Sequence, residues 1–144
     1  MKIAILGSGG REHALAYAIS KSEKIKKIYC LPGNAGTEDI AENIIIDTDN
    51  FKEVYEFLNK EKINLVIVGP EQPLVNGIVD FLEKRNVRVF GPNKIASQLE
   101  GSKIFTKNLC KKHSIPTADF GVFENIEDAK NFLQNVNYPI VIKA

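Results

Sequence analysis

A run of glycines followed by two charged residues is the first stretch of this chain that could bind a ligand. Gly7-Ser8-Gly9-Gly10 comes directly after the apolar residues Ile3–Leu6, and Arg11 and Glu12 follow it. Glycine can adopt positive φ, which lets the backbone turn tightly and approach a ligand. A helix that begins after such a turn also presents unpaired N–H groups and the positive end of its dipole. The segment therefore predicts a polar small-molecule site, although a glycine turn that only connects two elements stays open.

Two more polar loops follow apolar runs further along the chain. They are PGNAGT at residues 32–37, with Gly33, Asn34 and Gly36 as candidate contacts, and GPEQPL at residues 69–74, with Glu71, Gln72 and Pro73. The two prolines of the second segment predict a stiff loop that holds its acid and amide in place. If the apolar runs are parallel strands, all three loops follow strand carboxyl ends and can converge on one crevice. A simple turn at residues 32–37 stays open as an alternative.

The glycine run differs from a dinucleotide-binding fingerprint. That fingerprint is G-x-G-x-x-G, with an acidic residue about twenty positions further on for the ribose. Here Glu12 stands at the position of the third glycine, and the second apolar run ends in Cys30-Leu31-Pro32 without an acid. Because a glutamate would repel a pyrophosphate, these two departures disfavour a nicotinamide or flavin site.

The elements that must position these loops alternate between strand and helix. We expect strands at residues 3–6, 25–31, 43–47, 64–68 and 87–90, and helices at residues 12–21, 51–60 and 74–82. In the second helix, Phe51, Val54, Tyr55 and Leu58 recur at i, i+3, i+4 and i+7 and share one face. This alternation predicts the α/β fold class: a doubly wound, Rossmann-like parallel sheet with helices on both faces, ordered around the strand at residues 3–6.

The pattern changes after Pro92. We expect helices at residues 93–99, 103–113 and 126–133, the second capped by Ser102, and strands at residues 120–123 and 138–144. Lys143 stands late in an apolar strand, where burial without a partner would be costly. We therefore divide the chain into an N-terminal domain at residues 1–92, connecting helices at 93–119 and the beginning of a further domain, truncated here, at 120–144.

Composition restricts the classes of function. The 144 residues are 44% hydrophobic and 26% charged, with a formal net charge of +1. These values are ordinary for a globular protein and give no indication of nucleic acid or of a membrane surface. Cys30 and Cys110 have neither metal-site spacing nor a disulfide framework, so we expect reduced thiols in a cytoplasmic protein.

The segments GSGGREHAL, PGNAGT, GPEQPL, FGP, LEGSK and PIVIKA together resemble the phosphoribosylamine–glycine ligase family of the ATP-grasp superfamily. They occur in order over the whole chain, although family members are much longer. The resemblance implies that residues 1–92 form a pre-ATP-grasp substrate domain and that residues 120–144 begin an ATP-binding domain. It implies a step of de novo purine biosynthesis. ATP phosphorylates glycine, and the amine of 5-phosphoribosylamine attacks the glycyl phosphate, giving glycinamide ribonucleotide, ADP and phosphate.

The resemblance also implies roles for the candidate residues. Gly7–Glu12 would line a sugar–amine pocket with backbone N–H groups, with Arg11 or Glu12 as side-chain contacts, and Glu71 would accept hydrogen bonds from ribose hydroxyls. The other loop residues, Gly33, Asn34, Gly36, Gln72 and Pro73, would complete the substrate site. Lys103 and Lys143 match lysines that contact nucleotide phosphates. Catalytic residues and the ligands for Mg²⁺ or Mn²⁺ are expected beyond residue 144, so we expect the chain alone to be inactive.

The implied partners are small molecules: 5-phosphoribosylamine, glycine and ATP, with no nucleic acid, no membrane and a monomeric state. Two rival classes stay open. One is another ATP-grasp carboxylase or ligase, such as a biotin carboxylase, and the other is a Rossmann-type nucleotide-binding module. Nothing in the sequence positively supports a non-enzymatic interaction domain.

Overall fold

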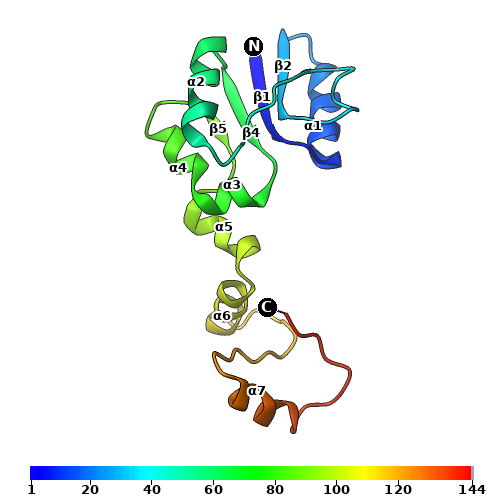
Figure 1. Cartoon of the computed structure of the whole chain (residues 1–144), viewed down its shortest axis with the longest axis vertical. Helices are drawn as coiled ribbons and strands as arrows, with labels where there is room; N and C mark the ends of the chain where they lie inside the picture. The colour runs from blue at the N-terminus through cyan, green and yellow to red at the C-terminus, as the bar shows by residue number, and fades with distance from the viewer. Residues whose placement is uncertain (144) are drawn as a thin grey trace. The chain divides into compact units, whose positions relative to one another are not determined.

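The computed structural model describes residues 1–143 and divides into two compact units (Figure 1). The first unit is Met1–Gly101 and the second is Ser102–Ala144. Residues 93–101, which the sequence analysis grouped with the connecting helices, therefore belong to the first unit by their contacts. Within residues 1–143, no helix combines the length and the apolar character needed to cross a membrane.

The first unit contains a five-stranded sheet in the order β3-β2-β1-β4-β5, and all four pairings are parallel. Its strands are β1 (Lys2–Gly7), β2 (Lys27–Pro32), β3 (Glu42–Asn43), β4 (Leu65–Val68) and β5 (Val89–Phe90). Its helices are α1 (Gly10–Ser20), α2 (Phe51–Glu61), α3 (Glu71–Asn76), α4 (Ile78–Glu83) and α5 (Lys94–Gly101). The predicted α/β class and the parallel sheet are confirmed.

The central position of β1 follows from its sequence. Ile3, Ala4, Ile5 and Leu6 are all buried, as expected for a parallel strand that is covered on both faces. Ile3 pairs with Ile28 of β2 on one side and with Leu65 of β4 on the other. The sheet is therefore ordered around β1, as the sequence predicts.

Two apolar clusters pack on opposite faces of the sheet. Ile3 and Ile5 contribute to the cluster that contains Ala16 of α1. Ala4 and Leu6 contribute to the larger cluster, which also contains side chains of α2, α3 and α4. Because neighbouring residues of a strand point to opposite faces, β1 supplies both cores, and helices cover both sides of the sheet (Figure 1).

Two expectations for the first unit are wrong. The strand expected at residues 43–47 is reduced to β3, which pairs with β2 at only two positions; the Ile44 N–H still donates to the Cys30 carbonyl at 2.9 Å, but residues 44–47 are not part of a strand. The stiff loop expected at residues 69–74 is instead the start of α3, with Pro70 as the N-cap. A proline is tolerated in a first helical turn, where its missing N–H has no intrahelical partner.

A single glycine separates α3 from α4, where the sequence analysis expects one helix. Gly77 has φ +99° and is both the C-cap of α3 and the N-cap of α4. Its N–H donates to the carbonyls of Pro73 and Leu74, which ends α3 in the manner of a left-handed C-cap. The residues Glu71 and Gln72 therefore stand on a short helix of their own.

The second unit contains two helices in its described part, α6 (Lys103–Lys112) and α7 (Ile126–Leu133). Ser102 caps α6 by accepting a hydrogen bond from the N–H of Phe105 at 3.2 Å, as predicted. The strand expected at residues 120–123 is wrong, since these residues belong to no strand of the structure. Residues 138–143 likewise form no strand, and Ala144 lies outside the described residues.

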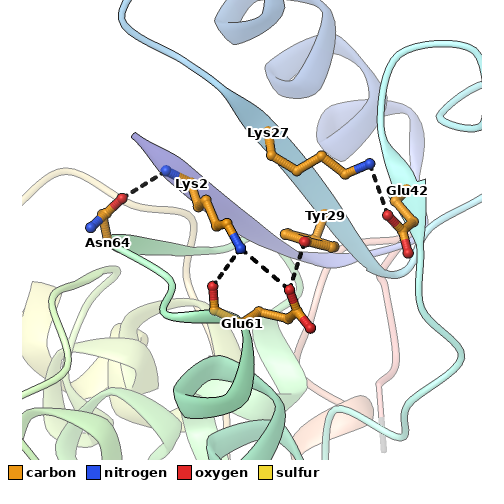
Figure 2. A network of polar contacts seen from close by, with 6 residues as sticks. All are labelled: Lys2, Lys27, Tyr29, Glu42, Glu61 and Asn64. Carbon is orange, nitrogen blue, oxygen red and sulfur yellow. Dashed lines mark hydrogen bonds and ion pairs between the residues drawn. The ribbon is translucent and has the colours of Figure 1, made fainter.

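A polar network ties the amino-terminal ends of β1 and β2 to the end of α2 (Figure 2). The Tyr29 hydroxyl donates to Glu61 Oε2 at 2.8 Å, and Lys2 Nζ donates to the Glu61 carbonyl at 2.8 Å. Lys27 forms an ion pair with Glu42 at 2.8 Å. Burial and the neighbouring Glu61 raise the pKa of Tyr29 to about 12. This network is structural and lies at the opposite sheet edge from the strand carboxyl ends.

Candidate functional site

The three polar loops of the first unit all follow carboxyl ends of strands. The loop after β1 precedes α1, the loop after β2 contains Gly33 and Asn34, and the loop after β4 precedes α3. Since β2, β1 and β4 are neighbours and run parallel, the three loops emerge at the same edge of the sheet (Figure 1). The predicted convergence of the candidate loops is thus built into the topology.

Asn34 joins the loop after β2 to the loop after β1. Its side-chain Nδ2 donates to the carbonyl of Ser8 at 2.8 Å and more weakly to that of Gly9 at 3.4 Å. Its Oδ1 accepts from the N–H of Thr37 at 3.1 Å. The Asn34 side chain therefore joins the two loops, and we call this set of hydrogen bonds the Asn34 clasp.

Two residues that the sequence analysis missed hold this clasp in place. Thr37 is fully buried, and its Oγ1 accepts from the Asn34 N–H and donates to Asn43 Oδ1, at 2.8 Å and 2.7 Å. Asn43 Nδ2 in turn donates to the Asn34 carbonyl at 2.8 Å. A Cβ at Gly33 would collide with the Asn43 amide, and Gly33 has φ +76°. The threonine of PGNAGT, a residue type that often bonds to turn backbone, was the available signal.

Arg11 and Glu71 meet across two loops. Arg11 stands in the first turn of α1 and Glu71 in the first turn of α3, and their side chains form an ion pair at 3.4 Å. Both remain well exposed, at 68% and 55%. An exposed pair of this kind contributes little to stability, so both groups are available to a ligand with matching charges or hydroxyls.

Glu12 is placed differently from Arg11. Only 3% of the residue is exposed, and its Oε2 accepts a hydrogen bond from the Gly9 N–H at 2.6 Å. The carboxylate is packed against the backbone of Gly7, Gly9 and Gly69. Its other oxygen, Oε1, is buried and has no hydrogen-bond partner.

The remaining candidates fall into two groups. Gln72 is exposed and donates to Asn76 Oδ1 at 3.2 Å, whereas Pro73 is buried in the core. Lys103 begins α6 and Lys143 is the last described residue, and both are exposed in the second unit. Residues 1–143 contain no group of three His, Cys, Asp or Glu side chains that could hold a metal ion. The ATP and metal assignments thus stay predictions.

Two hollows on the first unit lie away from the candidate loops. One, of about 360 Å³, is lined by residues that include Leu58, Ile63 and Arg85. Another, of about 320 Å³, is lined by residues that include Ile25 and Glu38. Neither contains a predicted site residue, and neither gathers reactive side chains. The loops at the strand carboxyl ends are therefore the better candidate, because charged groups, glycines and a buried carboxylate meet there.

The fold and the candidate site define an open parallel α/β domain with three polar loops beyond the carboxyl ends of its strands. The family described as phosphoribosylglycinamide synthetase, N domain, matches residues 1–100. The ATP-grasp (A) domain of the same synthetase matches residues 101–144. The chain belongs to the phosphoribosylglycinamide synthetase family.

Individual relatives agree with this assignment. The chain is 47% identical to a phosphoribosylamine–glycine ligase of Clostridium acetobutylicum, covering all of this chain and 35% of that protein. It is 50% identical to the corresponding ligase of Mesorhizobium japonicum, covering all of this chain and 34% of that protein. The chain therefore spans about a third of the length of the curated relatives that it matches.

Solved structures support the same fold. The crystal structure of a phosphoribosylamine–glycine ligase from Thermotoga maritima matches with a TM-score of 0.70 and 32% identity, over 95% of this chain and 31% of that one. An N5-carboxyaminoimidazole ribonucleotide synthetase from Thermus thermophilus matches with a TM-score of 0.68 and 24% identity, over 95% and 37%. The second likeness shows the shared fold alone.

Proposed function

We propose that this chain supplies the substrate-binding N-terminal part of an ATP-dependent ligase that joins glycine to 5-phosphoribosylamine. The observation that carries the proposal is the 47% identity, over the whole chain, to a protein named for that reaction. Glycine would be activated as glycyl phosphate, and the amine of 5-phosphoribosylamine would attack its carbonyl carbon. Phosphate would leave as the C–N bond forms, giving glycinamide ribonucleotide.

The residues of the first unit would bind and orient the sugar–amine. Backbone N–H groups of the glycine turn other than that of Gly9, which donates to Glu12, would face the substrate. Gly33 and Gly36 would allow close approach from the second loop. Glu71 would accept hydrogen bonds from ribose hydroxyls, because a carboxylate can take two neighbouring donors. The ion pair between Arg11 and Glu71 would then weaken, and Arg11 would contact the substrate instead. Such positioning lowers the entropic cost of bringing the amine to the acyl carbon.

The nucleotide would be held mainly by parts that the matched relatives have and this chain lacks. Lys103 and Lys143 have the right chemistry for phosphate oxygens, since both are exposed cations. ATP with Mg²⁺ or Mn²⁺ would supply the transferable phosphoryl group and neutralise its charge. We propose that the chain alone does not catalyse the ligation, since it spans only about a third of the length of the matched relatives.

The experiment that tests this function adds the part of a relative that lies outside the region matched by this chain. Residues 1–144 are joined to the remaining two-thirds of the Clostridium acetobutylicum relative, and glycine-dependent ADP release is measured with 5-phosphoribosylamine. We expect activity that requires both substrates. A folded chimera without amine-dependent turnover would contradict the proposal and favour another ATP-grasp reaction.

Within that chimera, Glu71→Ala tests the proposed sugar contact. Hydrogen bonds to a charged acceptor contribute about 1.5–3 kcal/mol, so kcat/KM for 5-phosphoribosylamine should fall roughly ten- to a hundredfold. The KM for ATP should change little. Glu23→Ala, at an exposed position in the turn after α1, is the matched control. Unchanged kinetics for the amine would remove Glu71 from the site.

A further inference from the structure

The Glu12 carboxylate occupies a position where a glycine turn would otherwise receive a ligand anion. Glu12 is the third residue of α1, and Gly9, whose N–H it accepts, is the N-cap of that helix. Unpaired N–H groups and the positive end of the helix dipole make such a start favourable for negative charge. In this protein the negative charge is supplied by the chain itself.

The space around this carboxylate is shaped by glycines from two loops. A Cβ at Gly7 would lie 2.7 Å from Glu12 Cγ, and a Cβ at Gly9 would lie 2.8 Å from Oε2. A Cβ at Gly69, in the loop after β4, would collide with Oε1. We call the backbone surface of Gly7, Gly9 and Gly69 the glycine cradle. Since any side chain there would meet the carboxylate, the cradle is filled.

The carboxylate is also an unusual group to bury. Glu12 is only 3% exposed, and its Oε1 has no hydrogen-bond partner. Burying a hydrogen-bond acceptor without a partner destabilises the folded state. An apolar side chain would avoid the unpaired Oε1, although it would leave the Gly9 N–H without the acceptor that Glu12 Oε2 supplies. The negative charge at this position therefore calls for a reason besides packing.

We propose that Glu12 is a specificity-determining residue whose carboxylate acts as a built-in anion, fills the glycine cradle and excludes ligand phosphate groups from it. The inference concerns the same loops as the proposed function. It explains how a glycine turn of dinucleotide-binding type can serve a different ligand. Its consequence is that the phosphate of any substrate must be bound outside the cradle.

The test removes the Glu12 carboxylate and supplies an anion from solution in its place. Because the test needs no substrate, its result does not depend on whether the proposed ligase activity is correct. Glu12→Ala empties the cradle, Glu12→Gln keeps its volume but removes the charge, and Glu23→Ala is an exposed glutamate control. Each protein and the wild-type chain are unfolded thermally with and without sodium pyrophosphate at about 10 mM. Pyrophosphate stabilises many proteins nonspecifically, which the wild type and Glu23→Ala measure.

We expect pyrophosphate to raise the Tm of Glu12→Ala by about 4–8 °C more than that of the wild type, the shift expected for specific binding above Kd. Glu12→Gln should gain no more than the wild type, because its amide still fills the cradle. Equal gains in all four proteins would overturn the proposal. So would a Glu12→Ala protein that is unfolded in buffer and does not refold in pyrophosphate, because no ligand anion then replaces the carboxylate. An extra gain in Glu12→Gln would also count against occupation of the cradle as the cause.

Discussion

The two units of this chain differ in how they use apolar residues. In the described structure, every buried apolar side chain lies between Ile3 and Leu82, in the first unit. The second unit has apolar side chains too, but Ile126 is 69% exposed and Val141 is 81% exposed. Both α6 and α7 have an apolar stripe and neither has a buried residue.

The contrast shows what an alternating strand–helix sequence accomplishes. Parallel strands bury both faces only when helices return across them, and the first unit completes this arrangement within Met1–Gly101. The helices of the second unit form because of their caps and the spacing of their apolar residues. The described residues of that unit contain no sheet on which these helices could pack. Local sequence thus suffices for a helix, whereas a core needs elements that are distant in sequence.

The largest expected difference between the two units is in the stability lost when one apolar side chain is truncated in each. Leu82→Ala, at a fully buried position of α4, should lower the free energy of unfolding by about 2–5 kcal/mol. Ile126→Ala, in the exposed stripe of α7, should change it by less than about 0.5 kcal/mol. Urea denaturation followed by circular dichroism measures both. Similar losses for the two variants would show that the second unit also has a cooperative core.

An intermediate effect is expected from the Tyr29 hydroxyl of the first unit. Burial, followed by the hydrogen bond to Glu61, raises its pKa to about 12, so the fold favours the neutral phenol. Its contribution, on the order of 2–3 kcal/mol, is complete below the unfolded pKa near 10 and is lost as pH rises toward 12. Wild type should also be more stable than Tyr29→Phe at neutral pH, because Phe cannot donate the hydrogen bond that the Tyr29 hydroxyl makes to Glu61.

The measurement is the difference in unfolding free energy between wild type and Tyr29→Phe, followed from about pH 8 upward. The difference should shrink above about pH 10. Tyr138→Phe, at a tyrosine of the second unit that is 70% exposed, serves as the comparison. A difference that stays constant with pH would show that the buried hydroxyl is not linked to stability.

The smallest expected effect compares two helix caps. Asn50 caps α2 by accepting from the Glu53 N–H at 3.3 Å, and Ser102 caps α6 by accepting from Phe105 at 3.2 Å. Asn50→Ala should lower the unfolding free energy of the first unit by about 1 kcal/mol. Ser102→Ala should reduce helical content without moving that transition. A shift of equal size in both variants would mean that the two units unfold together.

Much of the first unit could be predicted from its sequence. The β-branched and apolar run at Ile3–Leu6 specified the central strand, and the spacing from Phe51 to Leu58 specified α2. The loop positions followed from the alternation of elements. These features depend on residues that are close in sequence, where propensity and periodicity are informative.

Other features could not be predicted because distant side chains decide them. The Asn43 side chain bonds to Thr37 and to the Asn34 carbonyl, and these contacts form only once the loop has folded. Likewise, the burial of Glu12 depends on Gly69, which is 57 positions later in the chain. The segments at residues 120–123 and 138–143 have strand-like composition but no partner strand in the described structure. A strand forms only when a neighbouring strand pairs with it, and the composition of a segment does not show whether such a neighbour exists.

The Asn34 clasp determines which positions of the two loops can accept substitutions. Its amide donates to main-chain carbonyls of Ser8 and Gly9, which every residue type possesses. The join between the two loops is therefore insensitive to the side chain at position 8, while position 34 must supply an amide of this reach. In a library randomised at both positions, folded clones should show a wide range of residues at 8 and a narrow one at 34. The glycine loop after β1 can thus vary at position 8 while the Asn34 side chain that holds it stays the same.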